Sequence, residues 1–435
     1  MRMLYSLLLV LIRPLVHLRL FWRARANPDY AQRRQERFGY SPSFIPSGAV
    51  WFHTVSAGET IAAAPLIRKL SADLAEQQIP VLVTTMTPTG SAEVTRLLDP
   101  VAHCYAPYDF ADAVKRFLDR TQPRMLVLVE TEIWPNMIGQ CEQRNIPVAL
   151  INARLSARSA RGYSKVRSLL TPVLRGIDWI ACQYSADAQR FRDLGVSDPQ
   201  LEVVGNLKFD VEDIPISEQQ REHLQLISDA ASLPDRSVWI AGSTHKGEDP
   251  VILEAHKQLL VTDPDACLLL VPRHPERFDA VFNMANEVFS TVRLSHWLAP
   301  GASISSGQLP QVIVVDLMGF LRPLYQVADL GFIGGSLIDA GGHNPIEAAV
   351  AGLPLFMGPG RYNFEAVCES FVQAGALHMV FDAKTLCDGL QELFSNDAER
   401  KLQGERAAAV VSTNAGATQR MRLKLARVAT GTSSQ

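Results

Sequence analysis

Carboxylates follow two of the short apolar runs in the first half of the chain. The run 49–54 is followed by Glu59, and the run 125–130 ends in Glu130, with Glu132 two residues later. Glu59 could act as a general base toward a hydroxyl group, and the pair Glu130 and Glu132 could orient a substrate hydroxyl or a cationic sugar. A serine three residues before Glu59 also fits a structural capping box, and Glu132 fits a plain helix start, so the pattern alone leaves both interpretations open.

Basic and small residues stand at comparable positions further along. Lys208 closes the first half of the chain, and Arg273 follows another apolar run. The segment 152–156, followed by Arg158 and Arg161 at a predicted helix start, suits a phosphate group, because arginines and helix N-termini both favour anions; a solvated basic face is the alternative. The glycine-rich stretch 331–336 precedes Asn344, which fits a helix N-cap that leaves the helix start accessible to a phosphate, and Glu347 follows. These glycines lack the spacing of a nicotinamide-binding fingerprint.

Apolar runs alternate with amphipathic helical patterns from residue 49 onward. Such runs predict parallel sheets covered on both faces, and hence two doubly wound α/β domains facing one another across a cleft, with ligands at the carboxyl ends of the strands. The predicted organisation is a membrane anchor at 1–22, a Rossmann-like domain at 40–210, a linker at 211–236 and a second Rossmann-like domain at 237–425. The predicted strands are 49–54, 81–85, 103–105, 125–130, 147–152, 179–183, 201–204, 238–241, 267–271, 312–315, 330–333 and 354–357, and the clearest predicted helices are 61–77 and 156–175.

The first forty residues differ from the rest. The apolar run 4–12 continues at 15–22, but Arg13 and Pro14 lie between, so an uninterrupted apolar span of ~20 residues is not present. Seven arginines fall between residues 13 and 37, and such basic flanks attract anionic headgroups and keep the following chain on the cytoplasmic side. We expect a membrane anchor that either spans the bilayer or lies in its interface; a secretory signal and a buried first helix are the alternatives.

Composition excludes several classes of protein. The 42 Lys and Arg against 45 Asp and Glu give a formal net charge of -3, so no global basic field exists to hold nucleic acid. Six scattered cysteines without a C-x-x-C pair predict reduced thiols and argue against a zinc site or a disulfide framework.

Seven segments together carry a family resemblance. They are Trp51-x-His53-x-x-Ser56-x-Gly58-Glu59, Thr84-Thr85-Met86-Thr87-Pro88-Thr89-Gly90, Glu130-Thr131-Glu132-Ile133-Trp134-Pro135-Asn136, Asn152-Ala153-Arg154-Leu155-Ser156, Lys208-Phe209-Asp210, Val271-Pro272-Arg273-His274-Pro275-Glu276-Arg277-Phe278 and Gly341-Gly342-His343-Asn344-Pro345. In this order they resemble the 3-deoxy-D-manno-oct-2-ulosonic acid (Kdo) transferases, which are lipid A glycosyltransferases of Gram-negative bacteria. The resemblance extends from the N-terminal anchor to about residue 360.

The resemblance implies a GT-B fold, in which the first of two facing Rossmann-like domains binds the lipid A precursor and the second binds the donor CMP-Kdo. It also implies inversion at the anomeric carbon, no metal or other cofactor, and a place on the cytoplasmic side of the cell inner membrane. Carried over by position, the general base falls on Glu59 and the transition-state-stabilising pair on Glu132 and Lys208. The CMP contacts fall on Pro272, Arg273, Met318, Gly319, Phe320, Asn344, Pro345, Ile346 and Glu347. Phe320 stands where the family often has a carboxylate, so only a backbone contact would persist there.

Two other functions remain open. A nucleotide-sugar 2-epimerase or another sugar transferase of the same fold would need no membrane anchor and would prefer a uridine diphosphate donor. A non-catalytic lipopolysaccharide-binding protein would not require Glu59.

Overall fold

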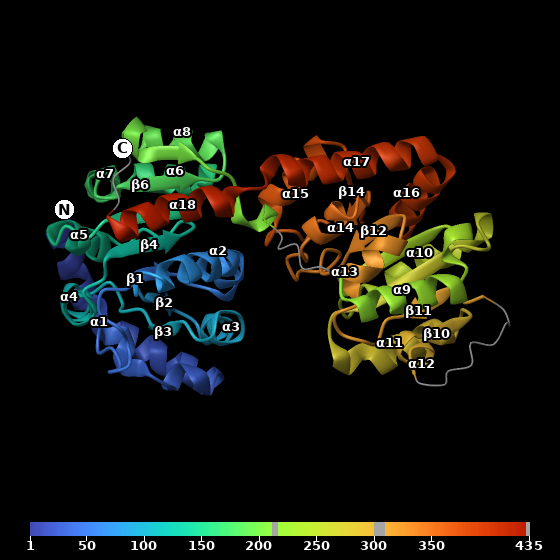
Figure 1. Cartoon of the computed structure of the whole chain (residues 1–435), viewed down its shortest axis with the longest axis horizontal. Helices are drawn as coiled ribbons and strands as arrows, with labels where there is room; N and C mark the ends of the chain where they lie inside the picture. The colour runs from blue at the N-terminus through green and yellow to red at the C-terminus, as the bar shows by residue number, and fades with distance from the viewer. Residues whose placement is uncertain (211–215, 300–308, 432–435) are drawn as a thin grey trace. The chain divides into compact units, whose positions relative to one another are not determined.

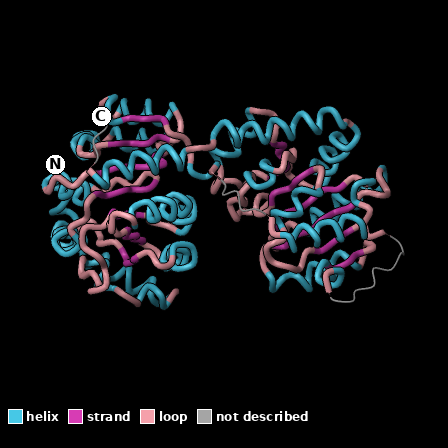
Figure 2. The backbone as a smooth tube through the Cα atoms, viewed as in Figure 1, coloured by secondary structure: helices cyan, strands magenta, loops and turns pink. Residues whose placement is uncertain are grey.

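The computed structural model describes residues 1–210, 216–299 and 309–431. The chain divides into two compact units: unit 1 comprises Met1–Asp210 and Asn414–Gln435, and unit 2 comprises Val211–Thr413. Each unit contains one parallel sheet flanked by helices (Figures 1 and 2). This architecture confirms the predicted α/β class with two Rossmann-like domains.

The sheet of unit 1 has seven strands in the order β3-β2-β1-β4-β5-β6-β7, and all neighbours are parallel. The strands are β1 (Val50–His53), β2 (Val81–Thr85), β3 (Ala102–Tyr105), β4 (Met125–Val129), β5 (Val148–Ala153), β6 (Trp179–Cys182) and β7 (Leu201–Val203). The chain order reverses between β1 and β4, which lie side by side with His53 paired to Leu128. In open α/β sheets such a reversal leaves a crevice at the carboxyl ends of the strands.

Unit 2 repeats this plan with the order β10-β11-β9-β8-β12-β13-β14. The strands are β8 (Val238–Thr244), β9 (Cys267–Pro272), β10 (Thr291–Arg293), β11 (Val312–Val314), β12 (Leu330–Ile333), β13 (Leu355–Met357) and β14 (Leu377–Met379). The reversal falls between β8 and β12. Sequence reasoning missed β10 and β14, because each is a three-residue edge strand that is only partly buried and carries no apolar run.

Helices cover both faces of each sheet. In unit 1 they are α2 (Ala57–Ala75), α3 (Pro88–Leu98), α4 (Ala111–Thr121), α5 (Pro135–Gln143), α6 (Ala157–Ser164), α7 (Arg167–Arg175), α8 (Ser185–Asp193) and α18 (Ala417–Thr430). In unit 2 they are α9 (Glu218–Ala230), α10 (Asp249–Thr262), α11 (Phe278–Asn286), α12 (Leu294–Trp297), α13 (Leu321–Leu324), α14 (Ile346–Val350), α15 (Glu365–Gln373), α16 (Ala383–Ser395) and α17 (Asp397–Asn414). The helix predicted at 156–175 is two helices, because Val166 leaves the helical conformation with φ -117° and ψ 28°.

Two predicted boundaries differ from the observed units. Helix α18 lies in unit 1, where Met421 and Leu425 are fully buried in the cluster that α2 forms with the sheet, so the second domain does not continue to residue 425. The carboxylate of Asp210 accepts hydrogen bonds from the backbone N–H groups of Gly416 and Thr418 and fixes the start of this helix. Within the predicted linker, α9 forms a helix of unit 2, while residues 211–215 lie outside the described part of the chain.

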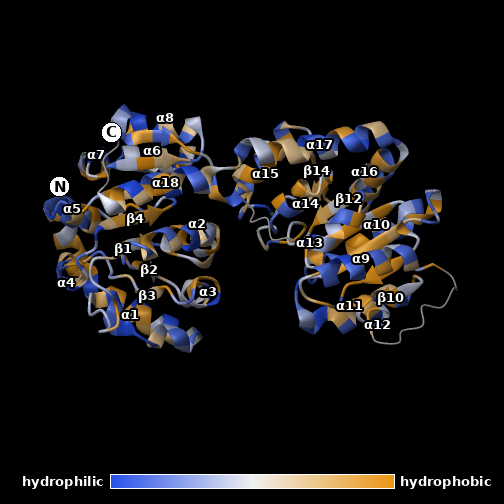
Figure 3. Cartoon of the chain, viewed as in Figure 1, coloured by the Kyte–Doolittle hydropathy of each residue, from blue (hydrophilic) through white to orange (hydrophobic). Residues whose placement is uncertain are grey.

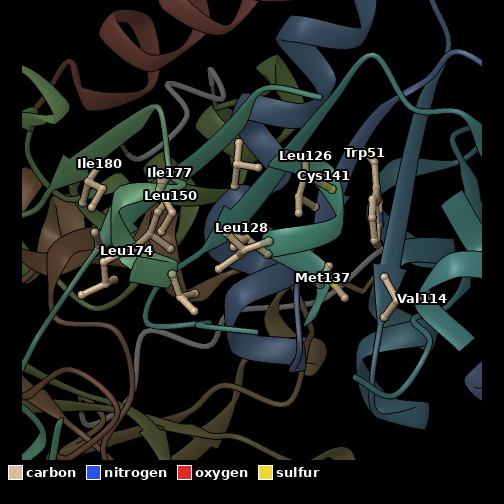
Figure 4. Packing of buried hydrophobic residues seen from close by; sticks show 14 of the residues in the cluster. Trp51, Val114, Leu126, Leu128, Met137, Cys141, Leu150, Leu174, Ile177 and Ile180 are labelled. Atoms are coloured by element: carbon tan, nitrogen blue, oxygen red, sulfur yellow. The ribbon is translucent and has the colours of Figure 1, made fainter. Parts of the chain in front are cut away.

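The buried core of each unit is built from the strands. Figure 4 shows part of the cluster in unit 1, where Trp51 of β1 packs near Leu126 and Leu128 of β4 and near Met137 of α5. In Figure 3 the strands of both sheets are coloured mainly as hydrophobic. Strands that are buried on both faces need apolar residues at every position, which is why the continuous runs located them.

The N-terminal segment is one continuous helix, α1 (Arg2–Ala26), with Pro14 inside it. The helix is continuous through Arg13 and Pro14, which interrupt its apolar sequence but not its backbone conformation. Of the helices in the described ranges, this one alone is long and apolar enough to cross a membrane, and Leu20 is the one buried residue among those of the helix whose burial is described. The alternative of a buried first helix is therefore wrong.

Candidate functional site

Both topological reversals carry the residues that the sequence singled out. In unit 1, β1 leads to Glu59 and β4 leads to Glu132. In unit 2, β9 ends in Pro272 and is followed by Arg273, and β12 is followed by Asn344. Since the strands of each sheet are parallel, these segments emerge at one edge of their own sheet.

Glu59 lies in the first turn of α2. Its carboxylate accepts hydrogen bonds from Val55 N at 2.6 Å and from Ser56 Oγ at 2.8 Å, and only 9% of the residue is exposed. Ser56 Oγ accepts from Glu59 N at 3.4 Å and so caps the helix. Ser56 is thus the N-cap that the capping-box interpretation expected. The Glu59 carboxylate, however, is buried rather than solvated, and helix capping alone does not require this burial.

Burial raises the pKa of Glu59 from its ordinary value of 4.5 to about 8. The hydrogen bond from Val55 N lowers this pKa, while the negative charges of Glu132 and Glu130 raise it. A carboxyl group whose pKa lies near neutrality is, once ionised, a stronger base than an exposed glutamate. The environment of Glu59 therefore suits removal of a proton from a hydroxyl group.

Glu132 is half-buried in the loop between β4 and α5. Trp134 Nε1 donates a hydrogen bond to its Oε2 at 2.8 Å. Burial raises the pKa of Glu132 to about 7, the Trp134 bond lowers it, and the charge of Glu130 raises it. Glu130 itself adopts φ 62°, a left-handed conformation that residues with side chains rarely take, and such strain is concentrated at functional sites.

Lys208 lies in the short 3-10 helix η4 (Leu207–Phe209), and its Nζ is 4.0 Å from Glu130 Oε1. Two buried amides hold this turn: Asn206 Oδ1 accepts from Lys208 N at 3.0 Å, and Asn152 Oδ1 accepts from Leu207 N at 3.0 Å. Asn152, near the end of β5, is fully buried and supports the Lys208 turn. Glu130, which was not among the predicted site residues, is the group that links Lys208 to the other acids.

His53 completes the inner wall of this site. It is fully buried at the end of β1, its Nδ1 lies 3.0 Å from Thr84 Oγ1, and its ring meets the edge of Trp134 at a centroid distance of 5.6 Å. Burial lowers the pKa of His53 to about 4, so the imidazole is neutral at physiological pH. A neutral ring adds no positive charge that would lower the pKa of the nearby carboxyl groups.

Three imidazoles gather where β8 and β9 end in unit 2. His245 Nε2 lies 2.8 Å from His343 Nε2 with the rings stacked, and the His274 ring meets His245 at a centroid distance of 5.2 Å. Burial lowers the pKa of His343 to about 4, and the charges of His245 and Arg273 act in the same direction. Arg273 N donates to Thr244 O at 3.0 Å, which fixes the arginine beside this group. Imidazoles and a guanidinium are suited to contact with an anionic ligand.

The amides of the loops around these histidines already have a partner. The fully buried carboxylate of Glu248 accepts hydrogen bonds from the backbone N–H groups of His245, Gly335, Ser336 and Leu337, at 2.7–3.0 Å. The glycine-rich stretch therefore does not present these amides to a phosphate. A buried protein carboxylate binds them instead.

The segment after β12 is organised by Asn344, whose Oδ1 accepts a hydrogen bond from Ile346 N at 3.1 Å. Helix α14 begins at Ile346, one residue later than the predicted start at Pro345. Glu347 is half-buried; burial raises its pKa and the charge of Arg322 lowers it. This carboxyl group remains a candidate for accepting ligand hydroxyls.

The segment after β11 is exposed at Met318 and Gly319 and partly buried at Phe320. Met318 is 60% exposed and Gly319 adopts φ 85°, where an added Cβ would meet no atom within 4 Å. The Phe320 ring stacks on His223 of α9 at a centroid distance of 5.9 Å. Since Phe320 packs within unit 2, its side chain does not replace the carboxylate that the family often has there.

Short motifs could not reveal the contacts that join distant segments. His245 and His343 lie 98 residues apart in the sequence although their side chains are in contact. Neither belongs to a metal cluster, because in residues 1–210, 216–299 and 309–431 no group of three or more His, Cys, Asp or Glu side chains could hold a metal ion. The signal that could have located His245 and His274 is their position just after β8 and β9, whereas His343 lies ten residues beyond the end of β12.

Comparisons with known proteins agree with this arrangement. Residues 32–211 match the family model described as 3-deoxy-D-manno-octulosonic-acid transferase. The 3-deoxy-D-manno-octulosonic acid transferase of Haemophilus influenzae is 37% identical and covers 97% of this chain and 97% of its own; that of Bordetella pertussis is 34% identical and covers 96% of each. The UDP-GlcNAc 2-epimerase of Neisseria meningitidis superposes with a TM-score of 0.56 at 14% identity, over 87% of this chain and 99% of that one.

The fold, with two parallel sheets that each carry candidate residues at a reversal, places the chain among GT-B proteins. The similarity to the two bacterial relatives extends over nearly the whole chain and identifies the family. The chain belongs to the 3-deoxy-D-manno-octulosonic acid (Kdo) transferase family and is a glycosyltransferase. Its exposed apolar N-terminal helix is consistent with membrane association.

Proposed function

We propose that this enzyme transfers Kdo from CMP-Kdo to a hydroxyl group of a lipid A precursor, lipid IVA, with inversion at the anomeric carbon and without a metal ion. The observation that carries the proposal is the buried Glu59 carboxyl, whose pKa of about 8 and place at the reversal of the first sheet suit a general base. Unit 1 would bind the acceptor and unit 2 the donor.

In the transfer, the acceptor oxygen bonds to the Kdo anomeric carbon, the bond from that carbon to the CMP phosphate oxygen breaks, and Glu59 takes the hydroxyl proton. General base catalysis of this kind contributes roughly 10²–10⁴ in rate. Glu132 and Lys208 would stabilise the charge that develops in the transition state. Glu132 is supported in this role by the hydrogen bond from Trp134, and Lys208 by the two asparagines that hold its turn.

CMP would be held by Pro272 and Arg273, by the backbone of the 318–320 segment (Met318, Gly319 and Phe320), and by Asn344, Pro345, Ile346 and Glu347. Arg273 would offset the negative charge of the leaving phosphate. His245 and His343, which the sequence did not assign, would line the same side of the sheet as neutral hydrogen-bonding groups.

The protein would work at the cytoplasmic side of the inner membrane, where the acyl chains of the acceptor remain embedded. The exposed apolar residues of α1 and the arginines that follow them support attachment to an anionic bilayer.

A direct test uses the purified full-length protein in detergent with CMP-Kdo and lipid IVA. Mass spectrometry should show a lipid product heavier by Kdo, with release of CMP, and nuclear magnetic resonance of the product should show the inverted anomer. UDP-N-acetylglucosamine serves as the control substrate; its epimerisation without Kdo transfer would favour the epimerase alternative. Binding of lipid IVA with neither reaction would favour the non-catalytic alternative.

A further inference from the structure

Helix α1 has two faces with different partners. Its exposed face carries large apolar residues that are 46–69% exposed: Leu4, Leu7, Leu8, Val10, Leu11, Leu15, Leu18, Phe21 and Trp22. The spacing of Leu4, Leu8, Leu11, Leu15, Leu18 and Trp22 is three or four residues, so they form one stripe along the helix. This face is available to lipid.

The other face of α1 contacts unit 1 through polar side chains. Arg13 pairs with Asp112 of α4 at 3.2 Å, and the His17 ring stacks on Phe38 at a centroid distance of 4.4 Å. These contacts occur beyond the middle of α1, and the contacts of Tyr5 and Ser6 occur near its start. The helix is therefore docked along unit 1 over several turns, as expected for a helix that lies in the bilayer interface.

The contacts near the start of α1 reach the residues that hold α5. Tyr5 Oη donates a hydrogen bond to Asp109 Oδ2 at 3.1 Å. Ser6 Oγ donates to Asn136 Oδ1 at 2.8 Å. Arg2 lies so close to Gly139 that an added Cβ would stand 1.6 Å from Arg2 Nη1, so α5 leaves room for this side chain.

Asp109 is the centre of this contact. It is 4% exposed, and its carboxylate accepts hydrogen bonds from Asn136 N at 2.9 Å and from Met137 N at 2.8 Å. Its backbone oxygen accepts from Asn136 Nδ2 at 2.7 Å. Asp109 thus satisfies the free amides of the first turn of α5, and Tyr5 donates to the same carboxylate.

The first turn of α5 directly follows the loop of residues 130–134, which we call the 130–134 loop. Trp134 is the residue immediately before α5, and its Nε1 donates to Glu132. A shift of Asn136 would therefore be transmitted over two residues to Trp134 and through its hydrogen bond to Glu132. In the proposed function, Glu132 raises the pKa of the general base Glu59.

We propose that α1 positions the 130–134 loop through Asp109 and Asn136, so that the helix which attaches the protein to the bilayer also orients the carboxylates of the candidate site. Tyr5, Ser6 and Asp109 are positioning residues in this proposal, which rests on the proposed Kdo transfer. Removal of residues 1–22 would therefore remove the Tyr5 and Ser6 contacts as well as the apolar stripe.

The test compares variants of the two faces in the full-length protein, with detergent-dispersed acceptor so that membrane attachment does not limit the rate. Tyr5→Phe with Ser6→Ala should lower kcat at least about threefold and leave KM for CMP-Kdo within twofold, because misplacement of catalytic groups by a fraction of an ångström reduces rate more than donor binding. Ser6→Thr retains the hydroxyl and should restore most of the loss attributable to Ser6.

The matched control is Leu8→Ala with Leu11→Ala, on the exposed face of the same helix. This variant should retain wild-type kcat in detergent but bind anionic vesicles less tightly. If the Tyr5 and Ser6 variants turn over as fast as the wild type, the positioning proposal is wrong although the proposed function stands. If the wild-type protein itself transfers no Kdo, the proposed function fails.

A second measurement needs no turnover. Amide hydrogen exchange at Asn136 and Met137, whose N–H groups donate to Asp109, should be faster in the Tyr5→Phe, Ser6→Ala protein than in the wild type, while exchange in the α4 residues away from Asp109 should be unchanged. Equal exchange at these two amides in both proteins would overturn the proposal.

Discussion

Replacement of Glu59 by glutamine should remove activity. The unfolding free energy of the Glu59→Gln protein, taken relative to that of the wild type, should also increase as the pH rises. Burial raises the pKa of Glu59 in the folded protein from 4.5 to about 8. Between these values the folded protein holds a proton that the unfolded chain has lost, so unfolding releases a proton and wild-type stability falls as the pH increases. Glutamine cannot ionise, and the Glu59→Gln protein escapes this loss.

The size of the effect follows from about 1.36 kcal/mol per pH unit for one proton. From pH 5.5 to 7.5 the wild type should lose about 2–3 kcal/mol of unfolding free energy relative to Glu59→Gln, so the Tm of the variant minus that of the wild type should rise by about 5 °C for a domain of this size. Glutamine also loses one acceptor for Val55 N or Ser56 Oγ, but that loss of about 1–3 kcal/mol is independent of pH.

The assay is thermal unfolding of both proteins in the same detergent at pH 5.5, 6.5 and 7.5, together with turnover of CMP-Kdo. Glu76→Gln, at the exposed C-cap of the same helix, is the matched control and should follow the wild type. Turnover of Glu59→Gln should fall by about 10²–10⁴. A Tm difference that stays constant over this pH range would refute the burial argument, and retention of more than a tenth of wild-type turnover would exclude Glu59 as the general base.

Three further predictions concern the same machinery. Glu132→Gln should move the rise of kcat/KM with pH to lower pH, because the charge of Glu132 raises the pKa of Glu59. If the pH profile of kcat/KM does not move, Glu132 does not influence the ionisation of Glu59. Dialysis against EDTA should leave transfer unchanged, and restoration of lost activity by Mg²⁺ would contradict the metal-free proposal. Met421→Ala should destabilise unit 1 by about 2–5 kcal/mol in chemical unfolding, since this fully buried residue of α18 fills the core beside α2; a change below 1 kcal/mol would contradict the packing.

The strands were the most predictable part of the fold. Buried parallel strands such as β4 and β9 require apolar residues at each position, and this produces runs that local sequence reveals. Edge strands such as β10 carry no such requirement. The domain end was also unpredictable, because the apolar face of α18 shows that the helix packs on a sheet but not on which sheet.

The candidate site was predictable where one strand carries its residue to the edge of the sheet. Glu59 and Arg273 each follow a strand, so their positions could be inferred from chain order. Contacts between distant segments could not be inferred. The carboxylate of Glu248 accepts hydrogen bonds from the backbone N–H groups of residues 335–337, and Asn152 Oδ1 accepts one from Leu207 N, just before Lys208. In both cases the partners lie tens of residues apart in the sequence.

The two reversals share a topology but differ in charge, and this difference argues for separate roles. The reversal of unit 1 gathers Glu59, Glu130 and Glu132, whose mutual repulsion and burial raise the pKa of two of them. Such a group repels a phosphate but readily accepts a proton from a neutral sugar hydroxyl. The reversal of unit 2 sets the guanidinium of Arg273 beside neutral imidazoles such as His343, while the nearby carboxylate of Glu248 is buried and bonded by four backbone N–H groups. An acceptor hydroxyl at the first and a nucleotide phosphate at the second therefore fit the electrostatics of each unit, whereas the opposite assignment would place like charges together.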